Sequence, residues 1–165
     1  MLRFLLQYVR ADFYNPLVQF LVRITNPLLL PLRRLIPGYR GLDMASIVLA
    51  FALQLLEVIL MAALREYAAG VGGILLITVM ELFKLLINIY LWGVIIQVVL
   101  SWVNPDPYHP VARVLAQLTA PLLRPARRLI PPISGVDLSP MLVVVALIFV
   151  SLLLQDFLGL WARLG

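Results

Sequence analysis

The sequence predicts an all-α, polytopic membrane protein, and three observations support this fold class. Hydrophobic residues make up 63% of the 165-residue chain, and the mean hydropathy is +1.03. Charged residues make up only 13%, whereas soluble domains carry roughly 25%. Three apolar stretches are also long enough to cross a bilayer core about 30 Å thick, which takes roughly 20 helical residues.

Each expected span is a continuous apolar run. The runs cover residues 43–64, 74–103 and 138–161. Asp43 and Asp137 stand at the start of the first and third runs. A carboxylate at this position can accept hydrogen bonds from the free amides of the first helical turn, and it faces the positive end of the helix dipole.

The distribution of arginine predicts the orientation of the chain. Residues 10–42 hold five arginines and residues 104–137 hold four, while the connection 65–73, which is rich in glycine, holds one. Loops that carry an excess of arginine and lysine stay in the cytoplasm. We therefore expect a multi-pass protein of the cell inner (plasma) membrane, with both arginine-rich segments cytoplasmic and the connection and C-terminus outside.

The chain contains an internal repeat with an offset of 94 residues. TNPLLLPLRRLIPGYRGLD (residues 25–43) aligns with TAPLLRPARRLIPPISGVD (residues 119–137) without a gap, with 12 of 19 positions identical. We interpret residues 1–69 as repeat one and residues 70–165 as repeat two. Each unit is a span, an amphipathic Arg-Pro segment and a second span, so the repeats are expected to be parallel, related by an axis along the membrane normal.

The same offset predicts that repeat one lacks its first span. Residues 74–103 of repeat two map onto positions before residue 1, apart from the short run MLRFLLQYV. Two explanations are open: a start codon assigned too late, or a truncated paralogue.

Each repeat also carries an amphipathic helix before its arginine pair. The helices are expected to open at Asn15–Pro16 and His109–Pro110, where a capping residue precedes proline at the first helical position. We expect them to lie in the headgroup region or to fold back between the spans. A break is predicted at the proline pairs that follow in each helix, which are Pro27 and Pro31, and Pro121 and Pro125.

The doubled signature T-x-P-L-L-x-P-x-R-R-L-I-P resembles the YggT family of small bacterial integral membrane proteins, which has plastid relatives. The likeness covers nearly the whole chain. Family members look like four-span proteins, and this chain departs from them by lacking the span before RFLLQYVRADFYNP.

The resemblance implies no known catalytic activity. It links bacterial relatives to osmotic tolerance, ion homeostasis or cell division, and plastid relatives to assembly of membrane complexes and to nucleoid organisation. The expected function is therefore a non-enzymatic inner-membrane protein that organises or assembles membrane components, with a role in osmotic tolerance or cell-envelope homeostasis. The alternative is a component of an ion channel or transporter.

The paired arginines are the first candidate site. Guanidinium groups present forked donors that suit phosphate, so Arg33, Arg34, Arg127 and Arg128 could bind anionic lipid headgroups or a partner protein. Alternatively, these arginines only set the topology. Asp43 and Asp137 could close an ion pair with an arginine of their own repeat or could simply cap the following helix.

Charged residues within the expected spans form the second candidate site. Ionisable residues are costly in a membrane and often functional. The expected spans contain four such residues. Measured along the helices, they converge on the outer half of the membrane, where they could form a cation site. The simpler interpretation is an ion pair three residues apart, with the long second span projecting into the headgroups. The four residues are Glu57, Glu81, Lys84 and Asp156.

Several classes of function have no support in the sequence. There is no cysteine, and His109 is the single histidine, so we expect no metal site and no cofactor. No serine lies in a recognisable nucleophile motif, so no catalytic residue is predicted. The expected partners are the bilayer, its anionic lipids, and other membrane proteins or further copies of the chain, and no nucleic acid.

Overall fold

The computed structural model describes residues 1–38, 41–64, 70–103, 106, 109–130 and 137–164. Within these ranges the protein is all-helical and no strand is present, which confirms the all-α part of the predicted class. The six helices are α1 (Leu2–Tyr8), α2 (Pro16–Leu35), α3 (Met44–Leu64), α4 (Val71–Val103), α5 (Pro110–Leu129) and α6 (Ser139–Leu164).

Three helices are long and apolar enough to cross a membrane. They are α3, α4 and the part of α6 from Ser139 to Gly159. These bounds agree closely with the three predicted spans. Helix α4 begins earlier than predicted, at Val71, so Gly72 and Gly73 lie in its first turn and not in the connection before it, and α6 continues to Leu164, beyond the predicted end at residue 161.

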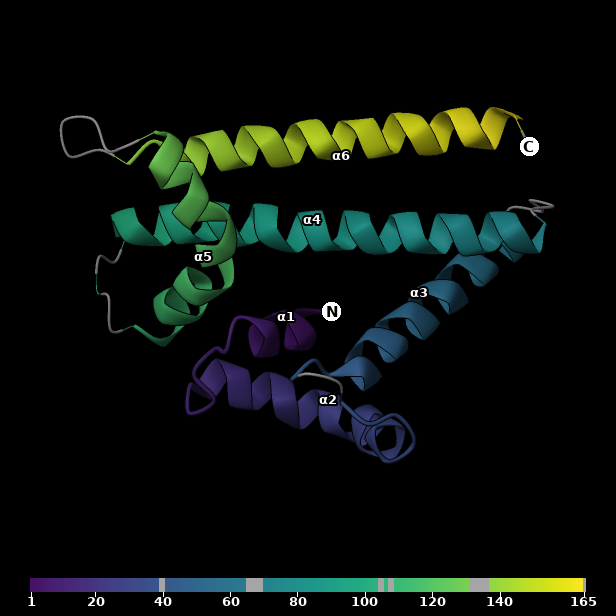
Figure 1. Ribbon diagram of the computed structural model, residues 1–165, viewed down its shortest axis with the longest axis horizontal. Coiled ribbons are helices and arrows are strands. Elements are labelled where there is room, and N and C mark those ends of the chain that lie inside the picture. The colour runs from purple at the N-terminus through teal and green to yellow at the C-terminus, as the bar shows by residue number, and fades with distance from the viewer. Residues whose placement is uncertain (39–40, 65–69, 104–105, 107–108, 131–136, 165) are drawn as a thin grey trace.

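The long helices are arranged around α4. In Figure 1, α4 and α6 lie side by side along the long axis, and α5 lies across them near one end. At the opposite end α3 meets α4, then diverges from it toward α2 (Figure 1). The C-terminal end of α6 lies at the same end as the meeting of α3 with α4 (Figure 1). The short helix α1 packs against α2, α3 and α5.

In the described residues the core has two buried clusters, one where the two halves of the chain meet and one between α4, α5 and α6, around Val94 and Leu123. Leu5 and Leu6 of α1, Val18 of α2, and Val114 and Leu118 of α5 form one buried cluster. In contrast, many large apolar side chains of α3, α4 and α6 face outward. Outward apolar faces on helices of this length suit contact with lipid tails and not with water.

The amphipathic helices run through their proline pairs, so the predicted break is wrong. Pro27 and Pro31 lie inside α2, and Pro121 and Pro125 lie inside α5. Figure 1 shows that α2 and α5 change direction along their length. Proline removes one backbone donor and crowds the preceding turn, and a bend relieves both effects while the remaining helical hydrogen bonds are kept.

Both amphipathic helices start at the predicted residue, but only α2 has the predicted side-chain cap. Asn15 is the N-cap of α2, and its Oδ1 accepts a 3.0 Å hydrogen bond from the backbone N–H of Leu17. His109 is the N-cap of α5 but makes no side-chain capping bond, and its Nδ1 is buried without a partner in the described part of the chain. The imidazole therefore occupies the position of Asn15 without its role.

Candidate functional site

The first arginine pair forms a corner between the end of α2 and the start of α3. Nη2 of Arg33 lies 2.5 Å from Oδ2 of Asp43, and its Nε donates a longer 3.4 Å bond to Oδ1. Asp43 also accepts hydrogen bonds from the hydroxyl and the backbone N–H of Ser46 in α3. We call Arg33, Arg34 and Asp43 the first corner. In it, Asp43 both pairs with arginine and caps the helix.

The second corner repeats this arrangement between α5 and α6, and comprises Arg127, Arg128 and Asp137. Nε of Arg127 donates a 2.9 Å hydrogen bond to Oδ2 of Asp137. Oδ1 of Asp137 accepts from the backbone N–H and the hydroxyl of Ser139, at 3.0 and 2.6 Å. Each of these residues except Ser139 lies 94 positions after its counterpart in the first corner.

Both carboxyls are held in the charged form. Burial alone raises the pKa of Asp43, but the hydrogen bonds from Arg33 and Ser46 outweigh it, and the net pKa lies below the ordinary value. For Asp137, the hydrogen bonds from Ser139 and Arg127 likewise outweigh burial and lower the pKa. A bond that favours the charged form of a carboxyl acts in this direction.

The second arginine of each corner is differently placed from the first. Arg34 and Arg128 are exposed in the last turns of α2 and α5. Among the residues that the structure describes, neither has a hydrogen-bond or ion-pair partner. Each corner therefore contains one arginine that holds the fold together and one whose five N–H donors remain available to a ligand.

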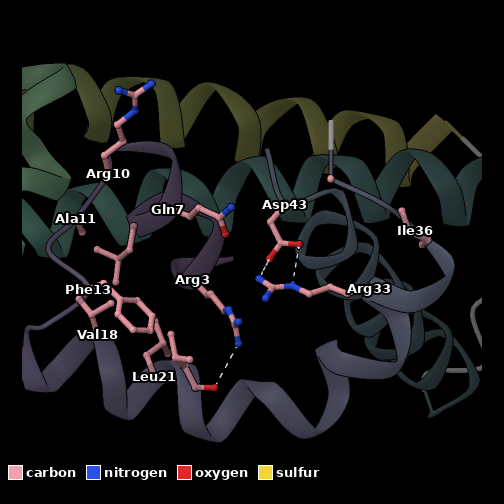
Figure 2. Close-up of a pocket in the computed structure, with 13 residues that line it drawn as sticks. Arg3, Gln7, Arg10, Ala11, Phe13, Val18, Leu21, Arg33, Ile36 and Asp43 are labelled. Atoms are coloured by element: carbon pink, nitrogen blue, oxygen red, sulfur yellow. Dashed lines mark hydrogen bonds and ion pairs between the residues drawn. The ribbon is translucent and has the colours of Figure 1, made fainter. Parts of the chain in front are cut away.

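A pocket of about 540 Å³ lies beside the first corner. Figure 2 shows Arg3 and Arg33 directed into the same region, with Asp43 on Arg33, while Arg10 points away from them. Arg10 follows α1 in the left-handed conformation, at φ 53°. Its N–H donates to Gln7 O, and the next N–H closes the helix end on Leu6 O, as in a Schellman motif.

A second pocket of about 810 Å³ lies beside the second corner and is lined by Arg127, Asp137 and Gln97 among others. Gln97 lies 94 residues after Arg3. Both contact the equivalent threonine: Nη1 of Arg3 donates to Thr25 Oγ1 at 2.6 Å, and Thr119 Oγ1 donates to Gln97 Oε1. The correspondence between the halves thus extends from the corners to the pockets.

Arg3 and Gln97 are the site residues that sequence reasoning missed. The signal was present, because the offset of 94 that aligns the corners also aligns Arg3 with Gln97. It was weak, because the residue types differ and α1 has only 7 residues to compare with the end of α4.

The predicted intramembrane residues make contacts within their own helices. Lys84 Nζ lies 3.3 Å from Glu81 Oε1 in α4, and Glu57 accepts a 2.8 Å hydrogen bond from Gln54 in α3. Asp156 is exposed on α6. Within the described ranges, no hydrogen bond or ion pair joins these groups across helices, so their grouping in one cluster stays a prediction.

Polar contacts also join the two halves. Nη2 of Arg113 lies 3.4 Å from Oδ2 of Asp12, whose backbone N–H donates to Gln117. Asn15 Nδ2 donates to Pro110 O at 2.8 Å.

In the described residues there is no group of three His, Cys, Asp or Glu side chains that could hold a metal ion.

Fold and site together define a class: an all-helical protein with three membrane-span-like helices and two Arg–Asp corners at the starts of α3 and α6. The sequence model of the CCB3/YggT family matches residues 1–64 and 76–158. The chain belongs to this family.

Similar proteins come from several bacteria. An uncharacterized protein of Pseudomonas aeruginosa is 48% identical over 163 residues, covering 96% of this chain and 82% of that protein. The uncharacterized protein YggT of Escherichia coli K12 is 34% identical over 173 residues, covering 99% of this chain and 90% of its own length. A protein of Vibrio alginolyticus is 37% identical over 166 residues, with 99% and 89% coverage. No solved structure matches.

Proposed function

We propose that this chain is a non-enzymatic integral protein of the inner membrane that organises membrane components through its two corners. Arg34 and Arg128 would bind anionic lipid headgroups or the acidic surface of another membrane protein. Arg33 and Arg127 would keep the corners in shape by holding Asp43 and Asp137. A role in osmotic tolerance or cell-envelope homeostasis would follow from this contact.

The observation that carries the proposal is that the two arginines of each pair differ in their contacts. A signal for topology needs only positive charge near the ends of spans. The corners have more: one arginine is held by a carboxylate that also caps the next helix, and its neighbour is exposed at equivalent positions in both halves. Clustered arginine at a membrane surface attracts anionic lipid, by about 1 kcal/mol per charge.

The orientation is part of the same proposal. The halves would be parallel repeats with both corners on the cytoplasmic side, where the leaflet carries most anionic lipid. The alternative of an ion channel or transporter component has less support, because the charged residues of α3 and α4 pair within their own helices.

The test compares two double variants with the same loss of charge. Arg34→Gln with Arg128→Gln removes the exposed arginines, whereas Arg23→Gln with Arg124→Gln removes two exposed arginines from earlier turns of α2 and α5. We expect the first variant alone to lose enrichment of phosphatidylglycerol around the protein, measured by lipid analysis of nanodiscs. In a bacterial strain without its own family member, only the first is expected to fail to restore growth at high osmolarity.

Equal effects of the two double variants would contradict the proposal, since total charge and not the corners would then be responsible.

The channel alternative has a separate measurement. Neutralising Glu57, Glu81 and Asp156 is expected to leave both lipid enrichment and growth unchanged. A changed ion flux into liposomes in that triple variant would favour the alternative.

A further inference from the structure

The pocket beside the first corner has more positive than negative charge. Among the described residues, Arg3, Arg10 and Arg33 line it, with Arg10 directed away from the other two, and Asp43 supplies the one carboxylate. Asp43 is already engaged by Arg33 and Ser46. The pocket beside the second corner is balanced, since Arg127 faces Asp137 and the other polar residues lining it are neutral.

Arg3 is the unusual member of this group. It is only 9% exposed, yet within the described residues it has no ion-pair partner. Its Nη1 donates to three uncharged oxygens, those of Val22, Thr25 and Asn26. Its Nε and Nη2 have no hydrogen-bond partner in the same ranges, and neither is among the fully buried atoms without a partner, so both have access to the pocket that Arg3 lines. A buried charge is strongly unfavourable unless an opposite charge and hydrogen bonds compensate for it.

The surroundings of Arg3 increase the need for a counter-charge. Burial lowers the pKa of Arg3, and the nearby charge of Arg33 lowers it further, while Asp43 acts in the opposite direction. Figure 2 shows the Arg3 and Arg33 side chains directed toward a common region beside the pocket. Arg33 uses Nε and Nη2 on Asp43 and keeps Nη1 for a ligand, while Arg3 keeps Nε and Nη2. Guanidinium donors that face one region from two side chains suit the oxygens of a phosphate group.

We infer that this pocket binds a phosphate-type anion, held between Arg3 and Arg33, and that the equivalent pocket of the second half does not. Apolar side chains of Leu6, Phe13 and Ile36 line the same pocket, so it can accept the glycerol region of a lipid beside its phosphate. The inference uses other residues than the exposed arginines of the proposed function, and it can hold if that function fails.

The experiment uses the full chain in nanodiscs of neutral phosphatidylcholine. Dioctanoyl phosphatidylglycerol and inorganic phosphate are titrated separately, and binding is followed by native mass spectrometry and by the rise in unfolding temperature. Binding of the lipid alone identifies a headgroup as the ligand, and binding of both identifies a free phosphate site. If neither binds, the inference is overturned.

The first variant is Arg3→Gln, which places in the first pocket the residue type that the second pocket has at Gln97. Loss of one charged hydrogen-bond donor is expected to weaken binding by about ten- to a hundredfold. The matched control Arg23→Gln removes the same charge from an exposed position of α2 and is expected to bind as the unchanged protein does. Unchanged binding by Arg3→Gln overturns the inference.

Arg3 donates hydrogen bonds from α1 to α2, so Arg3→Gln can also affect folding. A second variant therefore tests the inference by a gain of binding in the other pocket. The double variant Gln97→Arg with Ala120→Asn rebuilds the Arg3 environment beside Thr119 and Arg127, because Ala120 stands where the first half has Asn26. It is expected to bind a second phosphate group per chain. No second binding event would overturn the inference. Arg34→Gln with Arg128→Gln leaves this pocket intact, so it separates the inference from the proposed function.

Discussion

At the scale of single residues, the two corners use the same chemistry in different surroundings. The side chain of Asp43 is 5% exposed and that of Asp137 is 31% exposed. Attraction between charges strengthens as water is excluded, and removing one member of a buried pair leaves the other uncompensated. The first corner is therefore expected to contribute more to stability than the second.

This difference predicts unequal effects of two identical substitutions. Asp43→Asn is expected to reduce the free energy of unfolding by about 1.5 to 3 kcal/mol, because it removes the negative charge and one of the two oxygens that accept hydrogen bonds from Arg33 and Ser46. Asp137→Asn is expected to cost no more than about 1 kcal/mol, as is usual for partly exposed pairs. Reversible unfolding in detergent micelles measures both. Similar losses would mean that burial does not distinguish the corners.

The lowered pKa values of Asp43 and Asp137 predict sensitivity to acid. When a carboxyl has a lower pKa in the folded than in the unfolded protein, the unfolded state takes up the proton first as the pH falls. The stability from both corners is then present above about pH 4, the ordinary value for aspartate, and is lost as the pH falls through the folded pKa. The unfolding temperature is expected to fall below pH 4 more steeply in the unchanged protein than in the double variant Asp43→Asn with Asp137→Asn. Parallel curves would contradict this.

At the scale of elements, α2 and α5 are equivalent in sequence position but differ in what they contact. Both have 20 residues, begin with proline and end with an arginine pair. Phe20 and Ile24 of α2 are 63% and 59% exposed, whereas the equivalent Val114 and Leu118 of α5 are 8% and 3% exposed. At these positions α5 packs in the core, while α2 presents an outward apolar stripe and buries other side chains, Val18 and Leu29.

An outward apolar stripe on an amphipathic helix predicts that α2 lies in the membrane interface. Because the chain contains no cysteine, single cysteines report on this without background labelling. Ile24→Cys is expected to react slowly with a charged maleimide in nanodiscs. Arg23→Cys lies about 100° around the helix from it and is expected to react at least about tenfold faster, since thiolate formation and access both need water. Equal rates would place both faces of α2 in water.

Sequence patterns predicted these elements unequally. The spans were predictable because a long apolar run is a local property of the chain, and the start at Asn15 was predictable from its capping chemistry. The continuity of α2 through Pro27 and Pro31 was not, because proline reduces helix propensity everywhere and only the surrounding packing determines whether a helix bends or ends.

At the scale of the whole molecule, both corners stand at the N-terminal ends of candidate spans. Asp43 precedes α3 and Asp137 precedes α6, while Gly70 precedes α4, which packs against both. If α3 and α6 each cross the membrane once from their corner, Arg34 and Arg128 lie on one face. Gly70, at the far end of α3, then lies on the other.

This topology predicts the labelling of three single-cysteine variants in sealed vesicles of known orientation. Arg34→Cys and Arg128→Cys are expected to react with an impermeant maleimide from the same side. Gly70→Cys, where an added side chain meets nothing within 4 Å, is expected to react from the opposite side. Labelling of the two corners from opposite faces would contradict the parallel arrangement of the halves.

The sequence by itself predicted the helical class, the three long apolar helices, the similarity of segments 94 residues apart, and an ion pair between arginine and aspartate as one of two interpretations of Asp43 and Asp137. These are properties of local composition and of position along the chain. The tertiary structure decided which equivalent residues differ in environment: Asp43 is buried and Asp137 is not, Val114 is in the core and Phe20 is not. It also placed Arg3, without a carboxylate of its own, beside Arg33. Burial and the distance between charges depend on which helices pack together, and two segments of similar sequence can pack against different neighbours.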